Sequence, residues 1–192
     1  MLKAAARRNL RAHVAKGGLI AYATASCFGI GCDPRNKRAV QKLLRVKRRP
    51  QKKGLILIGN NFADLRPFVK TLSAAQQKIA EEKWPGPHTW LMAASRRTSR
   101  LIRGRHAQVA LRADAHPEAR EVCKLLGMAI TSSSLNRAGR VPVRTYREAR
   151  RQFGESVLVL PGRTGSDKSP STIQDFETGR LIRRQASAWL HK

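Results

Sequence analysis

The chain has 192 residues, a length that suits one domain, and 41% of them are hydrophobic, which is enough for a core. Lys and Arg number 39 against 12 Asp and Glu, so the net charge of +27 predicts an anionic partner: nucleic acid, a nucleotide or an acidic membrane surface. Aromatic residues make up only 5%, which argues against stacking of single-stranded bases. No apolar run is long enough to span a membrane, so we expect no membrane-embedded partner.

The cysteines and histidines carry no pattern of their own. Cys27, Cys32 and Cys123 are odd in number and irregularly spaced, which predicts neither a disulfide framework nor a zinc site. This usage favours a reducing compartment. The five histidines show no ligand spacing, so no protein metal site is expected.

The first 16 residues are rich in arginine and contain no acidic residue. This composition suits either the first helix of the domain or a mitochondrial targeting segment. We favour the domain helix, because it leads without a linker into a predicted strand at residues 18–24. Leu10 and Val14 would then face the core, and Gly17 would end the helix.

Predicted strands and helices alternate along the chain. Apolar or alternating runs predict strands at 18–24, 55–58, 88–94, 107–113, 128–132 and 157–160, and a terminal hairpin at 171–176 and 180–184. Periodicity and capping pairs predict helices at 36–46, 73–84 and 117–126, another from Thr145, and a short helix or irregular segment at 61–70. Residues 28–34, 95–105, 133–140 and 161–170 are predicted loops. This order predicts a single α/β domain, residues 1–192, with a largely mixed sheet.

Lys47 and Arg49 are the first candidate binding residues. Pro50 favours an extended backbone at Arg49, and residues two apart on an extended segment point the same way. We therefore expect Lys47 and Arg49 to converge on one anion while Arg48 faces away. A guanidinium fork beside an ammonium group suits a phosphate, and the alternative is a solvated basic helix end.

Four further polar residues are candidate binding residues. Ser134 and Asn136, again two apart, suit a phosphate or a ribose, or else a capped turn. Arg112 lies in an apolar strand, which predicts a charged partner for it. Thr24 ends the first strand, and the glycine-rich loop after it has Pro34 at the third glycine position of a dinucleotide-binding fingerprint, which excludes that site.

Six segments in chain order form a pattern that is more specific than any one of them. They are Leu19-Ile20-Ala21-Tyr22-Ala23-Thr24 with Phe28-Gly29-Ile30-Gly31-Cys32-Asp33-Pro34; Lys47-Arg48-Arg49-Pro50 before Lys53-Gly54-Leu55-Ile56-Leu57-Ile58; Trp84-Pro85-Gly86-Pro87-His88-Thr89; Val109-Ala110-Leu111-Arg112 with His116-Pro117; Ser134-Leu135-Asn136; and Pro170-Ser171-Thr172-Ile173. Together they resemble the TsaC/YrdC family, the threonylcarbamoyl-AMP synthases, in its short bacterial form. The resemblance covers residues 10–185.

The resemblance implies a twisted mixed α/β sheet with flanking helices and a positively charged concave face. It also implies a role for each candidate residue. The implied roles are catalysis for Lys47 and Arg49, nucleotide binding for Lys47, Arg49, Ser134, Asn136 and Arg112, and threonine binding for Thr24 and Arg112.

The implied reaction joins L-threonine, bicarbonate and ATP into L-threonylcarbamoyladenylate and pyrophosphate. A TsaB/TsaD/TsaE-type machinery would then use the product to modify tRNA in the cytoplasm. A carbamate made from threonine and bicarbonate attacks the α-phosphate, so the site needs cations that neutralise these anions rather than a side-chain nucleophile. Mg²⁺ is implied as an ion bound through ATP, with few protein ligands.

The chain departs from the family pattern at two places. Ala23-Thr24-Ala25 stands where the family shows Pro-Thr-Glu, which removes a carboxylate near the implied threonine site. Residues 165–170 lack an arginine-asparagine pair that often precedes Pro-Ser in close relatives.

The excess positive charge supports an alternative function on the same scaffold, a non-catalytic protein that binds double-stranded RNA, rRNA or tRNA. Basic segments at 35–48, 96–105 and 137–151 would contact RNA phosphates without aromatic stacking. A third interpretation is a solvated basic surface with no role in RNA binding.

Overall fold

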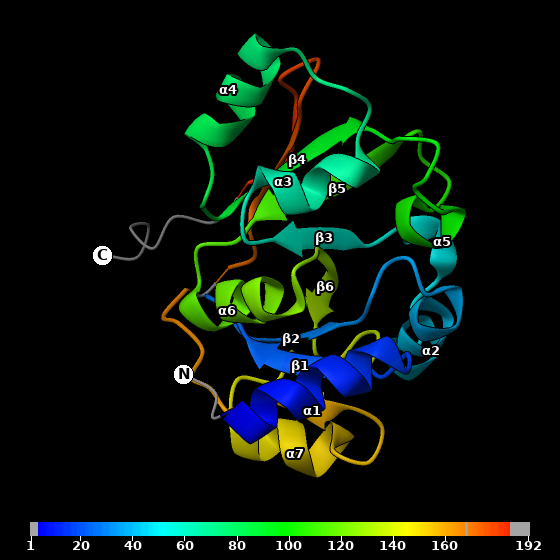
Figure 1. Cartoon of the computed structure of the whole chain (residues 1–192), viewed down its shortest axis with the longest axis vertical. Helices are drawn as coiled ribbons and strands as arrows, with labels where there is room; N and C mark the ends of the chain where they lie inside the picture. The colour runs from blue at the N-terminus through cyan, green and yellow to red at the C-terminus, as the bar shows by residue number, and fades with distance from the viewer. Residues whose placement is uncertain (1–3, 168, 185–192) are drawn as a thin grey trace.

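The computed structural model describes residues 4–167 and 169–184, and these form one nine-stranded sheet with helices packed against it (Figure 1). The strand order is β7-β1-β2-β6-β3-β5-β4-β8-β9. The pairs β1–β7, β3–β5 and β4–β8 are parallel and the other five are antiparallel, which confirms the predicted mixed sheet. The strands are β1 (Ile20–Ala23), β2 (Phe28–Gly31), β3 (Ile56–Gly59), β4 (His88–Ala93), β5 (Gln108–Ala113), β6 (Ile130–Ser134), β7 (Leu158–Val159), β8 (Thr172–Asp175) and β9 (Leu181–Arg183).

Three of the helices, α2, α4 and α7, begin where the sequence supplies a capping side chain. Asn36 accepts a hydrogen bond from the backbone at the start of α2. The pairs Ser73 with Gln76 and Thr145 with Glu148 make both hydrogen bonds of a capping box, as predicted. The helices are α1 (Ala4–Ala15), α2 (Lys37–Lys47), α3 (Phe62–Leu65), α4 (Ala74–Glu82), α5 (Arg100–Arg103), α6 (Pro117–Leu126) and α7 (Tyr146–Phe153), with 3-10 turns η1 (Gln51–Lys53) and η2 (Arg66–Phe68).

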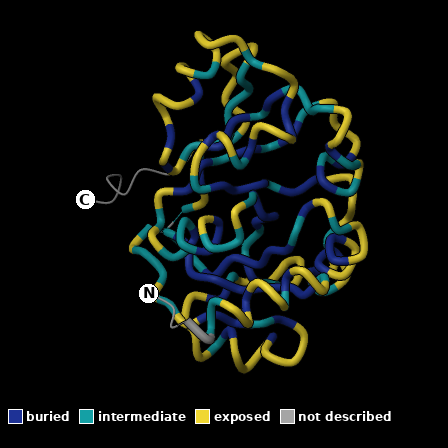
Figure 2. The backbone as a smooth tube through the Cα atoms, in the orientation of Figure 1, coloured by how far each residue is buried: buried dark blue, intermediate teal, exposed yellow. Residues whose placement is uncertain are grey.

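The two faces of the sheet contribute to two apolar clusters. Along β1, Ile20 and Tyr22 pack with α1 and α6, whereas Ala21 and Ala23 join the larger cluster that includes α2. This alternation follows from the two-residue period of a strand. Figure 2 shows the central strands buried and the outer sides of the helices exposed. Because α1 and α6 cover only part of their face, the rest of it is open for polar side chains.

The N-terminal helix is part of the domain, as predicted. Leu10 and Val14 are 0% and 2% exposed and pack in the cluster with α6. Gly17 ends the helical segment with a φ of +79°, a conformation that glycine adopts without strain. Residues 1–3 of the predicted helix, residue 168 of the predicted loop and residue 185 of the motif match lie outside the described residues.

The segment 160–171 crosses the sheet from one edge to the other, because β7 lies at one edge and β8 is next to the last strand at the other. Residues 160–167 stay beside β1 and the turn after it, since the N–H groups of Leu160, Gly165 and Asp167 donate to the backbone oxygens of Ala21, Thr24 and Ala25. We call the described residues 160–167 and 169–171 the strap.

Three loop predictions are wrong. Residues 28–34 contain a strand, because Phe28 and Ile30 are buried on one face while Gly29 and Gly31 lie on the other, close to the ring of Tyr22. Strand β6 extends through Ser134, which places two residues of the predicted 133–140 loop in the sheet. Residues 95–105 contain the short helix α5, so this stretch is not the loop that its polar, basic composition predicts.

We expect Gly31→Ala to destabilise the fold by about 1–3 kcal/mol, the usual cost of overpacking. A Cβ at this position would lie 2.3 Å from the backbone oxygen of Thr131 on the neighbouring strand, which cannot move away easily. Urea unfolding would measure the loss. Gly162→Ala is the control, because its Cβ would lie 3.1 Å from the side chain of Ala23 and it should cost less. Equal stability of the two variants would contradict the prediction.

Candidate active site

Two adjoining cavities open on the face of the sheet that α1 and α6 leave uncovered. Thr24, Ser26, Arg112 and Ser171 line both of them. We call the first, of about 190 Å³, the arginine cavity; its further lining residues include Arg49, Arg183, Ser132, Ser133 and Ser134. We call the second, of about 100 Å³, the aspartate cavity; its further lining residues include Asp114, His116, Asp167 and Ser169.

The arginine cavity has three guanidinium groups from distant parts of the chain. Arg49 follows α2 and donates from Nε to the backbone oxygen of Gly54 at 3.0 Å. Arg183 on β9 donates from Nε and Nη2 to Ser171, at 2.9 and 3.2 Å. Burial lowers the pKa of both arginines, and the charge of Arg112 adds to the effect on Arg183. Arginine keeps its charge even so, and the described lining residues include no carboxylate, so this cavity favours a polyanion.

Lys47 does not line either cavity, and the expectation that it and Arg49 share an extended backbone is wrong. Lys47 is the last residue of α2, and Arg48 takes a left-handed conformation with φ of 51°. The Lys47 side chain is therefore buried, at 4% exposure. Its ammonium donates to the backbone oxygen of Ser134, and to the backbone and side-chain oxygens of Asn136 at 3.1 and 3.3 Å.

Burial lowers the pKa of Lys47 to about 8, and the positive charge of Arg49 acts in the same direction. The three oxygen acceptors favour the ammonium form and oppose this shift. Lys47 thus fixes the end of α2 to the segment 134–136, with its charge directed at protein oxygens.

Ser134 and Asn136 do lie together, as their spacing predicts. The hydroxyl of Ser134 donates to Oδ1 of Asn136 at 2.6 Å, and Ser134 also lines the arginine cavity. Asn136 is outside the described lining of both cavities, and its Nδ2 donates to the backbone oxygens of Arg137 and Arg140. The capped-turn interpretation therefore describes Asn136 in this structure, while Ser134 belongs to both the turn and the cavity.

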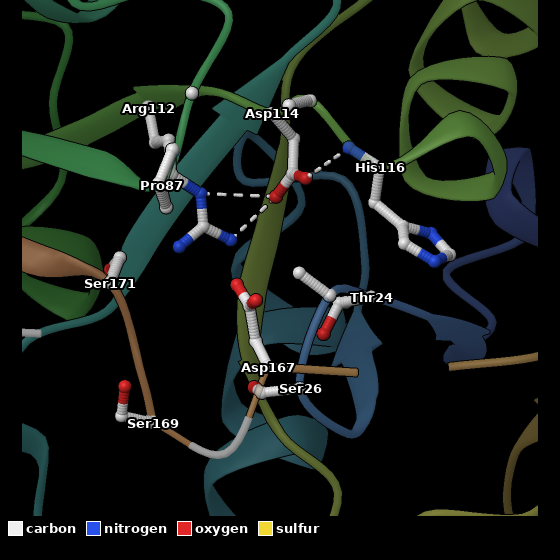
Figure 3. Close-up of a pocket in the computed structure, with 12 residues that line it drawn as sticks. Thr24, Ser26, Pro87, Arg112, Asp114, His116, Asp167, Ser169 and Ser171 are labelled. Carbon is white, nitrogen blue, oxygen red and sulfur yellow. Dashed lines mark hydrogen bonds and ion pairs between the residues drawn. The ribbon is translucent and has the colours of Figure 1, made fainter. Parts of the chain in front are cut away.

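Arg112 has the charged partner that its position in an apolar strand predicts. It donates from Nε and Nη2 to Oδ2 of Asp114, at 3.0 and 2.5 Å (Figure 3). The other oxygen of Asp114 accepts from the backbone N–H of His116 at 2.9 Å. Thr24 faces the aspartate cavity, and its hydroxyl donates to the backbone oxygen of Cys27 at 2.7 Å.

The sequence did not reveal Asp114, Asp167 and Arg183 as site residues. Asp114 could have been predicted from the sequence, because it stands two residues after Arg112 and so lies on the same side of an extended segment. Asp167 and Arg183 could not have been predicted in this way, because only the strap and the final hairpin bring them to the site. Within residues 4–167 and 169–184, no group of three or more His, Cys, Asp and Glu side chains could hold a metal ion, and no helix could cross a membrane.

A family model described as "Telomere recombination", named for Sua5, YciO and YrdC, matches residues 12–185. The chain belongs to this family. A relative from Methylobacillus flagellatus named threonylcarbamoyl-AMP synthase is 51% identical over 176 residues, which are 92% of this chain and 98% of the relative. A relative of the same name from Chromobacterium violaceum is 48% identical over 182 residues, which are 95% of this chain and 92% of the relative.

Solved structures of the family share the fold. The crystal structure of P. abyssi Sua5 complexed with L-threonine superposes with a TM-score of 0.86 at 25% identity, over 95% of this chain and 55% of that longer one. The crystal structure of E. coli YciO gives a TM-score of 0.79 at 21% identity, over 94% of this chain and 91% of that one. These likenesses confirm the predicted YrdC-like fold as a single-domain α/β architecture.

We expect Lys47→Met to lower the free energy of unfolding by about 2 kcal/mol, because buried carbonyl oxygens would lose their donor. Urea unfolding would measure the change. Lys52→Met is the matched control, since Lys52 is exposed and its replacement should stay within about 0.5 kcal/mol. Unchanged stability of Lys47→Met would contradict a structural role for this ammonium group.

Proposed function

We propose that the chain is a threonylcarbamoyl-AMP synthase, which makes L-threonylcarbamoyladenylate and pyrophosphate from L-threonine, bicarbonate and ATP. The names of its relatives at 48–51% identity support this reaction. The observation that carries it is the contact between an arginine cavity, whose described lining has no carboxylate, and a smaller aspartate cavity, with Thr24 and Arg112 among the residues that line both. A triphosphate suits the first and an amino acid suits the second, and Thr24 and Arg112 are at the junction where the two would react.

The reaction requires two bond-forming steps. The amine of threonine and bicarbonate form a carbamate with loss of water. A carbamate oxygen then attacks the α-phosphate, and pyrophosphate leaves. Both steps bring anions together, so we assign to Arg49, Arg112 and Arg183 the task of neutralising the phosphates and the charge that develops on phosphorus. Fixed placement of the reactants supplies a further part of the rate enhancement.

We assign the nucleotide phosphates to Arg49 and Ser134 directly, and to Lys47 and Asn136 through the segment that they hold. This assignment refines the expected roles, since the ammonium of Lys47 is bonded to residues 134 and 136. Mg²⁺ would be bound through the phosphate oxygens of ATP and would supply additional charge neutralisation. We place the reaction in the cytoplasm, where a TsaB/TsaD/TsaE-type machinery would consume the adenylate.

The purified chain should release pyrophosphate from ATP when L-threonine and bicarbonate are both present. Omission of either one should reduce release to background, because the carbamate cannot form. A coupled pyrophosphate assay would measure the rate. Background release with all three substrates present would contradict the proposed reaction.

Arg49→Gln tests the arginine cavity in the same assay. Loss of one charged hydrogen-bond donor should lower kcat/KM for ATP by roughly tenfold or more. Lys52→Gln, which removes an exposed charge three residues away, should leave it within about twofold. Equal effects of the two variants would contradict a specific role for Arg49 and would indicate that ATP binding depends only on the overall positive charge of the protein.

A second candidate function is RNA binding by the exposed side of α7. Arg147, Arg150 and Arg151 are exposed there, and the one acidic residue of the helix, Glu148, is used in its capping box. We propose that this surface contacts phosphates of tRNA or double-stranded RNA. RNA binding there is compatible with catalysis, since no residue of α7 is among the described residues that line either cavity.

Affinity for a short RNA duplex should fall steeply with salt, because phosphate binding releases counterions. The triple variant Arg147→Ala/Arg150→Ala/Arg151→Ala should make the salt dependence shallower by roughly one unit of log–log slope for each arginine–phosphate pair that it removes. Fluorescence anisotropy across a salt series would measure both. A flat response in the unmodified chain, or an unchanged slope in the variant, would contradict this surface as an RNA site.

A further inference from the structure

The aspartate cavity is an exception in a chain with a net charge of +27. Its described charged lining residues include two carboxylates, Asp114 and Asp167, beside Arg112. Carboxylates next to the arginine cavity are not needed for phosphate binding. They suggest a ligand that carries a positive group as well as a negative one.

Hydrogen bonds among the described residues indicate different roles for Arg112 and Asp114. Asp114 already accepts from the guanidinium of Arg112 with one oxygen and from the backbone of His116 with the other. Arg112 uses Nε and Nη2 for this pair, and no described residue accepts from its Nη1. Arg112 can therefore still bind an anionic group, while Asp114 mainly holds Arg112 in place.

Asp167 is the other carboxylate of the cavity, and its backbone is fixed against the end of β1. Its N–H donates to the backbone oxygen of Ala25 at 3.1 Å, and the N–H of Gly165 donates to the backbone oxygen of Thr24 at 3.0 Å. Arg144 donates to the backbone oxygen of Asp167 at 3.5 Å. Figure 3 shows the carboxylate pointing into the cavity, on the side of Thr24 and below Arg112.

We propose that Asp167 binds the α-ammonium group of the amino-acid substrate, while Arg112 binds its α-carboxylate. The proposal rests on the proposed function and names the residue that recognises the zwitterion. An amino acid that leaves water needs an opposite charge for each of its ends, because an unpaired buried charge is strongly unfavourable. Ala25 lines the same cavity without any charge, so Asp167 supplies from the strap the carboxylate that β1 and its following turn lack.

Asp167→Asn should raise KM for L-threonine by roughly 10- to 100-fold, the usual effect of losing one charge-assisted hydrogen bond. The Kd of ATP measured without threonine should change less than twofold. Glu155→Gln is the matched control, since it makes the same change of charge at an exposed position after α7 and should leave both constants unaltered. An unchanged KM for L-threonine in Asp167→Asn would overturn the proposal while leaving the reaction itself intact.

A ligand without the ammonium group separates recognition from a merely structural role. L-threonine and 2,3-dihydroxybutanoate, which has a hydroxyl in place of the amine, would be compared by calorimetry on the unmodified chain and on Asp167→Asn. The unmodified chain should prefer L-threonine by roughly tenfold or more, and the variant should lose most of this preference. Equal weakening of both ligands in the variant would overturn the proposal. Because this measurement is of binding, it remains decisive even if no pyrophosphate is released.

Discussion

The ammonium of Lys47 is the contact on which the geometry of the arginine cavity depends. It joins the last turn of α2 to the end of β6 and the turn after it, through three oxygen atoms of residues 134 and 136. Arg49 follows two residues later on one side, and Ser134 lies on the other. A buried ammonium is costly unless oxygens replace its hydration, and these three acceptors provide that replacement. The two walls of the cavity are thereby held at a fixed separation.

Opposite charges are sorted between neighbouring cavities, and this sorting would orient the substrates. The arginine cavity has cations from the segment after α2, from β5 and from β9, whereas both carboxylates of the described lining lie in the aspartate cavity. Arg112 belongs to both and is held by Asp114. A triphosphate placed in the aspartate cavity would meet two carboxylates, so its phosphates favour the other cavity. Discrimination of this kind comes from repulsion as much as from attraction.

Strongly patterned elements could be predicted from sequence, since local signals specify them. Helix α6 is one case, with Pro117 at its first position and Gly127 at its left-handed end. Strand β2 could not, because Gly29 and Gly31 have no side chains to reveal that their face is buried under Tyr22. The rule for a residue before proline also led us to expect an extended segment over residues 47–49, whereas α2 continues through Lys47 and Arg48 takes a left-handed conformation. The order of motifs identified the family where single motifs could not.

Some of the site residues could likewise be predicted from the sequence, and others could not. Thr24 and Arg112 could be predicted, because each stands on or at the end of a strand that its own residues specify. Ser134 could be identified from its spacing with Asn136, although its place in β6 could not. Asp167 and Arg183 could not be predicted, since their positions depend on the strap crossing the sheet and on β8 pairing with β4. Such long-range pairings leave no local trace in the chain. The structure was needed to bring these two residues to the cavities.

The pairing of β8 with β4 has a consequence for synthesis on the ribosome. Residues 172–183 are the last described strands, yet they pair with a strand that ends at residue 93 and supply Arg183 to the arginine cavity. A growing chain can build most of the sheet long before this hairpin emerges. Until then β4 has an unpaired edge, of the kind that invites aggregation. Completion of the arginine cavity and protection of that edge therefore both wait for the final hairpin, so a prematurely terminated chain would lack both.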